Sequence, residues 1–473
     1  MVTPTMSKAR AFVLLQTLAA CIAPALAADA ATTPAIESAP VPPPPAWLAG
    51  VDAMYDGLRV PGLERRDFSG SGSGADGPEH WWQVATPLLG TGAGFRVEEI
   101  GRSAEGRPLR HVRWGKGKTP VLLWSQMHGD ESTGSMALAD LFRFLGEHPD
   151  HPVTQRLRAS TTLHFMPMVN PDGAARFQRR NAQGIDLNRD ARMLATPEAR
   201  ALKALFDRVQ PAYGFNLHDQ QPGYRVGDSA RGTAIALLAP PSGPTNTVDP
   251  TRARAIEVAA SIRIALEPYI AGHLARWDDT FNPRAFGDLT AQWGSSTILI
   301  EAGAIEGDPQ KQQLRKLYFV GLLAALDSIA SGSHVGVPHA LYRELPENGD
   351  PWSDLRIDGG TLAIPGQPHA RADLLLEFGD PLAWRGGSIK DIGDLKERPA
   401  RRTVDARGLF IVPAMQRAPS TTAGAAEAPE TPCRIEIDAP ACFFLARDPQ
   451  GRDRVWSPDD IDPATVPSHD AGR

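Results

Sequence analysis

Short apolar runs alternate with helical patterns between residues 92 and 332, and this alternation constrains the fold more than any other feature. The runs are residues 121–124, 161–169, 213–217 and 297–300, and the helical patterns are residues 135–145, 197–208, 252–266 and 313–329. Strands that alternate with helices are typical of an α/β domain with a largely parallel sheet. We therefore predict such a domain over residues 92–332.

The first 27 residues favour export. Lys8 and Arg10 precede an apolar stretch that ends in Ala-Leu-Ala at residue 27, which is the pattern of a secretory signal peptide. A Leu-Ala-Ala-Cys sequence ending at Cys21 leaves a lipid-anchored protein as the alternative. No later segment is long and apolar enough to span a bilayer. The sequence thus predicts a periplasmic or secreted protein.

Three further segments differ from the α/β region in composition. Residues 28–45 are rich in Ala and Pro and predict an extended linker. Residues 46–91 predict an N-terminal extension that packs on the main domain. From residue 333 to residue 473, short apolar runs lie between Gly, Pro and Asp clusters, which favours a small β-rich C-terminal domain with a flexible tail.

Charge and cysteine content exclude several classes of protein. Lys and Arg number 49 against 55 Asp and Glu, with no basic run, so nucleic acid is not expected as a partner. Three cysteines are too few for a disulfide scaffold. Signal cleavage would leave Cys433 and Cys442, which could pair in an oxidising compartment or stay as separate buried thiols. Nothing in the sequence indicates the oligomeric state.

Four polar groups follow the ends of four predicted strands. They are His128 with Glu131, the Asn-Pro-Asp-Gly turn at 170–173, His218 and Glu301. Open α/β sheets bind ligands outside the carboxyl ends of their strands. We therefore expect these groups to converge at one edge of the sheet.

His128 and Glu131 have a His-x-x-Glu spacing, which places both side chains in one crevice if a helix begins near Glu131. Two imidazoles and one carboxylate form a catalytic zinc site, and His218 is the natural third ligand. Alternatively, His128 and Glu131 are surface residues at a helix start, where Glu is favoured anyway. A lone His-x-x-Glu motif is more often of that kind.

Here the motif is one of five that occur in order. They are QMHGDE at 126–131, NPDG at 170–173, DLNR at 186–189, LH at 217–218 and IEAG at 300–303. Together they resemble the funnelin metallocarboxypeptidases, the zinc carboxypeptidase family that includes the pancreatic enzymes. The resemblance covers residues 95–330 and leaves out the C-terminal domain. It implies a mixed, largely parallel twisted sheet flanked by helices, one zinc ion per chain and a peptide substrate with a free C-terminal carboxylate.

The resemblance also implies a role for each residue of the metal site. His128, Glu131 and His218 match the zinc ligands, and Glu301 matches the general base that activates water. Asp186 matches an acid that orients a zinc-binding histidine.

Substrate contacts are implied in the same way. Asn188 and Arg189 match the pair that binds the terminal carboxylate, a task suited to the arginine fork. Arg179 best matches the arginine that polarises the scissile carbonyl, with Arg180 as the fallback. An ordinary solvated loop is the alternative for this arginine-rich stretch.

One position departs from the family. Phe281 stands nearest to a tyrosine that caps the bound substrate in many members, and phenylalanine has no hydroxyl to donate. Either that hydrogen bond is absent or Tyr224 supplies it. Arg284 falls where the specificity pocket is built and would favour an acidic substrate side chain, although a surface arginine is an equal alternative.

The leading interpretation is therefore an exported zinc carboxypeptidase. Two other hydrolases on the same fold remain open, namely an aspartoacylase-like N-acyl amino acid deacylase and a murein-peptide amidase. A non-enzymatic binding protein is the fourth possibility, which the assembled catalytic residues disfavour.

Overall fold

The computed structural model describes residues 40–66, 77–417 and 430–461. The expected signal peptide, the alternative lipid site at Cys21 and the C-terminal tail lie outside these residues, as does most of the linker. Among the helices in the described ranges, none is long and apolar enough to cross a membrane.

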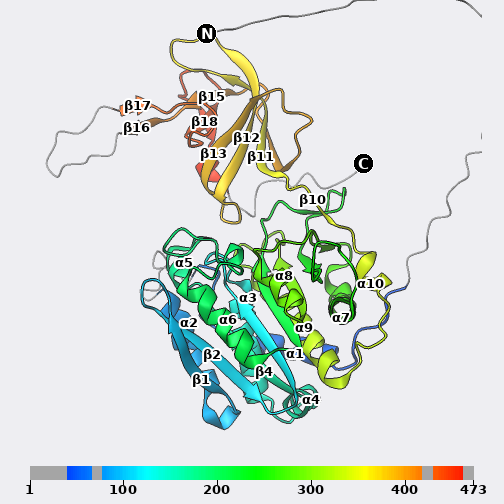
Figure 1. Cartoon of the computed structure of the whole chain (residues 1–473). Helices are drawn as coiled ribbons and strands as arrows, with labels where there is room; N and C mark the ends of the chain where they lie inside the picture. The colour runs from blue at the N-terminus through cyan, green and yellow to red at the C-terminus, as the bar shows by residue number, and fades with distance from the viewer. Residues whose placement is uncertain (1–39, 67–76, 418–429, 462–473) are drawn as a thin grey trace, which may run out of the picture. The chain divides into compact units, whose positions relative to one another are not determined.

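An eight-stranded sheet forms the centre of the α/β region (Figure 1). In spatial order its strands are β1 (Arg96–Arg102), β2 (Pro108–Gly115), β4 (Thr161–Met166), β3 (Thr119–Ser125), β5 (Tyr213–Asp219), β9 (Ser296–Ala302), β7 (Ile235–Leu238) and β8 (Leu274–Arg276). The strands β4, β3, β5 and β9 run parallel, whereas β1, β2 and β7 each pair antiparallel with a neighbour. The predicted mixed, largely parallel sheet is confirmed.

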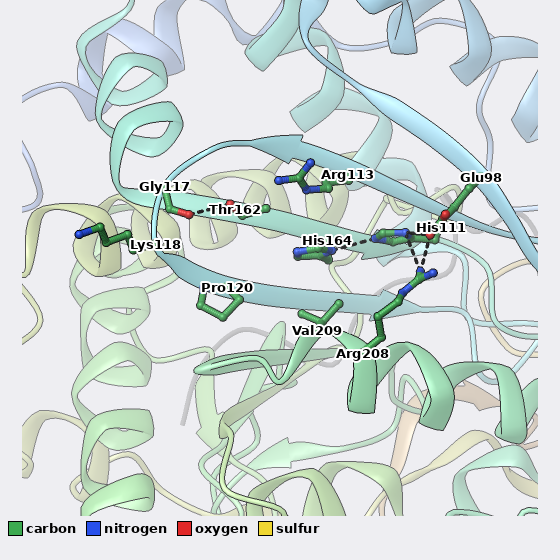
Figure 2. Close-up of a pocket in the computed structure, with 10 residues that line it drawn as sticks. All are labelled: Glu98, His111, Arg113, Gly117, Lys118, Pro120, Thr162, His164, Arg208 and Val209. Carbon is green, nitrogen blue, oxygen red and sulfur yellow. Dashed lines mark hydrogen bonds and ion pairs between the residues drawn. The ribbon is translucent and has the colours of Figure 1, made fainter.

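One face of this sheet is covered by α6 (Pro197–Val209) and α8 (Phe286–Gln292). Leu122 and Trp124 of β3 point to this face, because side chains alternate along a strand. Beyond the end of α6 at Val209, the same face carries the polar side chains of β2 and β4 (Figure 2). Apolar packing on this face therefore stops where α6 stops.

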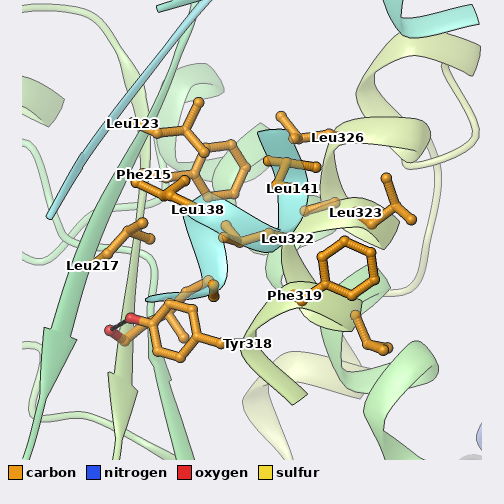
Figure 3. Close-up of a cluster of buried hydrophobic side chains, with 14 of the residues drawn as sticks. Leu123, Leu138, Leu141, Phe215, Leu217, Tyr318, Phe319, Leu322, Leu323 and Leu326 are labelled. Carbon is orange, nitrogen blue, oxygen red and sulfur yellow. Dashed lines mark hydrogen bonds between the residues drawn. The ribbon is translucent and has the colours of Figure 1, made fainter. Parts of the chain in front are cut away.

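The opposite face packs against the helices α3 (Thr133–Glu147), α4 (Pro152–Ser160), α7 (Pro250–Ile270) and α9 (Gln312–Ser331). Val121 and Leu123 of β3 both belong to this core. Figure 3 shows Leu123 on the side of the sheet that faces leucines of α3 and α9. Leu138 and Leu322 are fully buried in this layer. This larger core packs the sheet against a layer of helices.

The predicted strands and helices of the α/β region are all present, and most extend past their predicted ends. The structure adds β1, β2, β7, β8, α4 and α8 to them. The turn predicted at 170–173 is instead the start of α5 (Pro171–Arg176). The Asn170 side chain caps that helix by accepting from the Gly173 N–H at 2.8 Å.

Residues before the sheet form α1 (Leu48–Leu58) and α2 (Pro78–Ala85), and both contribute to the larger core. The Tyr55 hydroxyl donates to Asp140 of α3 at 2.8 Å. Arg315 of α9 pairs with the same carboxylate at 2.6 Å and donates to the Val60 carbonyl at 2.8 Å. Both charged groups are buried, so this pair anchors the N-terminal segment.

Residues after α9 add α10 (Ala340–Arg343) and the short ladder of β10 (Asn348–Gly349) with β6 (Arg225–Val226). A seven-stranded sheet then forms the β-rich C-terminal region, with its own apolar core. Its strands are β11 (Ser353–Leu362), β12 (Ala370–Asp380), β13 (Arg385–Gly393), β14 (Ala400–Asp405), β15 (Phe410–Pro413), β18 (Phe443–Ala446) and β19 (Arg454–Trp456). Beside it, β16 (Met415–Arg417) pairs with β17 (Glu430–Pro432), and Cys433 forms a disulfide with Cys442.

Candidate functional site

Neighbouring parallel strands bring His218 and Glu301 together. His218 of β5 pairs directly with Glu301 of β9, so both side chains lie at the carboxyl edge of the sheet. The Tyr318 hydroxyl, from α9, bridges the two strands at 3.1 Å from the His218 carbonyl and 2.5 Å from the Ile300 carbonyl. Sequence reasoning missed Tyr318, because a tyrosine in an apolar helix looks like ordinary core.

His128 reaches the same edge on the loop that follows β3. The loop is held by Gln126, whose side-chain amide donates to the Gly129 carbonyl at 3.0 Å, and by Asn170, which donates to the Met127 carbonyl at 3.1 Å. Gln126 has a φ of 52°, which is uncommon for a residue with a side chain. The capping motif at 170–173 thus serves to position the loop of His128.

Three buried side chains converge as a group that could hold a metal ion. One donor atom from each of His128, Glu131 and His218 lies within 4.8 Å of the other two. The Nδ1 atoms of His128 and His218 lie 2.6 and 2.7 Å from the two carboxylate oxygens of Glu131. Two imidazoles and one carboxylate are the donor set of many catalytic zinc sites.

The buried charge of Glu131 makes a cation favourable at the group of His128, Glu131 and His218. Burial opposes the charged form of Glu131, but the charges of His128 and His218 hold its pKa well below the usual value. Burial likewise opposes a charged His128, yet Glu131 and Asp186 raise its pKa to about 9. Since a buried carboxylate needs a positive partner, protons or a metal ion must supply that charge. The residues therefore fit a divalent metal.

Asp186 and Arg179 border the metal group. Asp186 Oδ1 lies 3.0 Å from Nε2 of His128, the ring nitrogen opposite the one that faces Glu131. Burial would raise the pKa of Asp186, but His128 and Arg179 lower it. The Arg179 guanidinium lies 3.0 Å from Asp186 and 3.4 Å from Glu131. Arg180 instead donates to the Gly184 carbonyl, away from this group.

Glu301 is buried at 7% exposure, and its Oε2 atom has no hydrogen-bond partner among the described residues. Burial, reinforced by the negative charge of Glu131, raises its pKa well above the usual value. A buried carboxylate without a partner is costly to maintain. Such an atom in a site of this composition points to a role in proton transfer.

The expected substrate-binding residues lie in different surroundings. Asn188 Nδ2 lies 3.4 Å from His218 Nε2, and Arg189 donates to the Asn188 carbonyl at 2.7 Å. Phe281 packs partly buried against the smaller core. The Arg284 side chain is exposed and forms no ion pair within the described ranges, so the structure does not join it to the metal group.

Two further residues, Asp288 and Tyr224, have raised pKa values and interact electrostatically with the residues described above. Asp288 is buried, which raises its pKa to about 6, and it accepts from the Asn282 N–H at 2.9 Å. The charge of Arg189 acts on Asp288 in the opposite sense. Burial and then the charge of Glu301 raise the pKa of Tyr224, whose ring lies 5.3 Å from Trp277. In the sequence, only its proximity to Arg284 draws attention to Asp288.

Comparison with known proteins shows that part of the chain is similar to carboxypeptidases. Residues 93–219 match the sequence profile of the family described as zinc carboxypeptidase. The chain is 26% identical over 201 residues to carboxypeptidase 2 of Trichophyton rubrum, covering 39% of this chain and 37% of that protein. It is 36% identical over 115 residues to carboxypeptidase D of Drosophila melanogaster, covering 20% of this chain and 8% of that protein.

A solved structure with a similar arrangement is the metallo-carboxypeptidase from Burkholderia cenocepacia, at a TM-score of 0.43 and 19% identity. That match covers 53% of this chain and 69% of the other. The chain spans 37% of the length of the Trichophyton relative and 8% of the Drosophila relative.

Proposed function

Residues 93–219 match the zinc carboxypeptidase family, and from this premise we propose that the protein is an exported metallocarboxypeptidase. It hydrolyses the C-terminal peptide bond of peptides and acts in the periplasm or outside the cell. The observation that carries the proposal is the buried group of His128, Glu131 and His218, with the unpaired carboxylate of Glu301 in register beside it.

One zinc ion per chain, the metal this family uses, would be held by His128, Glu131 and His218. Zinc at such a site supplies Lewis-acid chemistry, which polarises a carbonyl and makes water more acidic. Asp186 orients His128 through the ring nitrogen that does not face Glu131.

Glu301 acts as the general base and then as the general acid. Its unpaired oxygen takes a proton from the attacking water and later gives that proton to the leaving amine, so the carboxylate is regenerated. A raised pKa suits both steps, because a group whose pKa lies nearer the working pH can accept and release a proton readily.

Arg179 donates to the scissile carbonyl as negative charge develops on its oxygen. Its guanidinium already lies beside Glu131 and Asp186, which fixes its direction. Asn188 and Arg189 bind the terminal carboxylate of the substrate. Tyr224 supplies the hydroxyl that Phe281 lacks, since the charge of Glu301 already acts on it. Arg284 favours an acidic terminal side chain.

The test is incubation of the mature protein with a mixed peptide library, with products identified by mass spectrometry. We expect stepwise loss of single C-terminal residues, abolished by a chelator and by Glu301→Gln. The exposed Glu99 provides a matched control, and Glu99→Gln should leave the products unchanged. If acidic terminal residues are not preferred, the role of Arg284 is wrong.

Intact peptides throughout would refute the carboxypeptidase proposal. Muropeptides and N-acyl amino acids would then be the next substrates, because the two alternative hydrolases act on those classes of amide.

A further inference from the structure

A cavity of about 480 Å³ lies on the sheet face that α6 leaves uncovered (Figure 2). Its titratable lining residues are Glu98, His111, Arg113, Lys118, His164 and Arg208. Pro120 and Thr162 also line it, and both lie at the amino ends of their strands. His128 follows the carboxyl end of β3, so this cavity and the metal group occupy opposite ends of the sheet.

Strand register builds the polar lining. Glu98 of β1 pairs directly with His111 of β2, and Arg113 of β2 pairs directly with His164 of β4. Directly paired residues lie on the same face of a sheet with their Cβ atoms about 5 Å apart. A glutamate, two histidines and an arginine therefore stand as neighbours on a surface that an apolar helix would otherwise cover.

Positive charge predominates in this cavity. Arg113, Lys118 and Arg208 oppose a single acid, Glu98, with which Arg208 is paired. Within the part of the chain that the structure describes, the side chains of Arg113 and Lys118 form no hydrogen bond or ion pair. Their two charges remain available to an anion.

The two histidines add a hydrogen-bond acceptor. Nδ1 of His111 lies 2.7 Å from the Glu98 carboxylate, so it must carry a proton to donate. Neutral His111 then accepts at Nε2 from Nδ1–H of His164, at 2.9 Å. This order leaves Nε2 of His164 unprotonated. Burial, together with the positive charges of Arg113 and Arg208, lowers the pKa of His164 to about 3, which keeps the ring neutral.

We propose that this cavity binds a phosphate group that retains one proton, with Arg113 and Lys118 donating to its charged oxygens and its hydroxyl donating to Nε2 of His164. A protonated phosphate fits this cavity because the cavity combines positively charged donors with one hydrogen-bond acceptor. Carboxylate and sulfate carry charge near neutral pH but no proton, so they leave the imidazole nitrogen without a partner. A phosphate monoester retains a proton up to about pH 6, and its charged oxygens suit arginine.

The test is calorimetric titration of the zinc-loaded full chain with inorganic phosphate at about pH 6, where a phosphate monoester is still partly protonated. Sulfate and glycerol phosphate serve as the comparison ligands. We expect saturable phosphate binding with sulfate about tenfold weaker or worse. Tighter binding of glycerol phosphate would identify a phosphate ester as the occupant. Equal binding of phosphate and sulfate would overturn the role of His164.

Variants assign the binding to this cavity. Arg113→Gln with Lys118→Gln should weaken phosphate binding at least about tenfold, whereas His164→Leu should lower phosphate affinity to that of sulfate. Arg110 lies on the same strand but faces Glu79 on the other side of the sheet, so Arg110→Gln is the matched control. Peptide hydrolysis should stay unchanged in all of these variants. Undiminished binding in the double variant would refute the proposal.

Discussion

Gly129 lies next to His128, and the structure predicts that even one added methyl group there disrupts the metal site. A Cβ atom at Gly129 would lie 2.0 Å from the carbonyl carbon of Gly173 and 2.2 Å from the nitrogen of Ala174. These are backbone atoms, so no side chain can rotate away. Ordinary contact begins at 3.4 Å, so the loop of His128 and the helix α5 must separate by about 1.4 Å.

Such a displacement also moves His128, the residue next to Gly129. A misplacement of about 1 Å in an active site costs about 10²-fold in rate, and overpacking costs about 1–3 kcal/mol of folding free energy. We expect Gly129→Ala to lower kcat/KM at least about a hundredfold and to reduce the zinc content. The assay combines peptide hydrolysis, metal analysis and thermal unfolding of the purified variant.

Gly57 offers the matched control, because nothing lies within 4 Å of a Cβ added there. It lies inside the helix α1, where replacing glycine by alanine stabilises by about 0.5–1 kcal/mol. The same substitution should thus have opposite effects on stability at the two positions. A Gly129→Ala protein with full zinc content and activity within threefold of the wild type would refute the steric argument.

Four further predictions concern charged groups and the metal ion. Glu301→Gln should lower kcat/KM by about 10²–10⁴ with zinc content retained. In the metal-free protein, the pKa of Glu301 is raised well above its usual value, so the stability that this group contributes is lost as the pH rises through the raised pKa. The unfolding temperature of Glu301→Gln should therefore rise relative to that of the wild type as the pH is raised toward neutral. Chelation should abolish hydrolysis and lower the unfolding temperature, and added zinc should reverse both effects. Arg315→Met leaves the buried Asp140 carboxylate without its positive partner and should lower the free energy of unfolding by about 3–5 kcal/mol in denaturant titration. Lys203→Met, which removes an exposed pair, should cost less than about 0.5 kcal/mol. Equal losses would contradict the burial argument.

Local patterns predicted the parts of the site that depend on strand ends. The run before His218 and the run before Glu301 are both short and apolar, and the structure makes both of them buried parallel strands. A polar residue at the end of such a strand must lie at the edge of the sheet, because that is where the backbone leaves the core. The sequence order of the motifs could therefore be interpreted before any distance was known.

Other features required contacts between residues far apart in the chain. Nothing near Tyr318 in the sequence indicates that its hydroxyl bridges the backbones of β5 and β9. The motif at 170–173 predicts a turn, whereas its asparagine caps α5 and also holds the loop of His128. Both roles depend on which segments pack together, and such pairings are not written in local composition.

The sequence by itself determined the alternation of strands and helices, and the residue types and order of the candidate metal group, because periodicity and motif spacing are local properties of the chain. Only the tertiary structure decided that Arg179 rather than Arg180 faces the metal group, and that the Arg284 side chain is exposed. The tertiary structure also decided that Glu98, His111, Arg113 and His164 share one polar cavity, because strand register is set by pairing across the whole sheet.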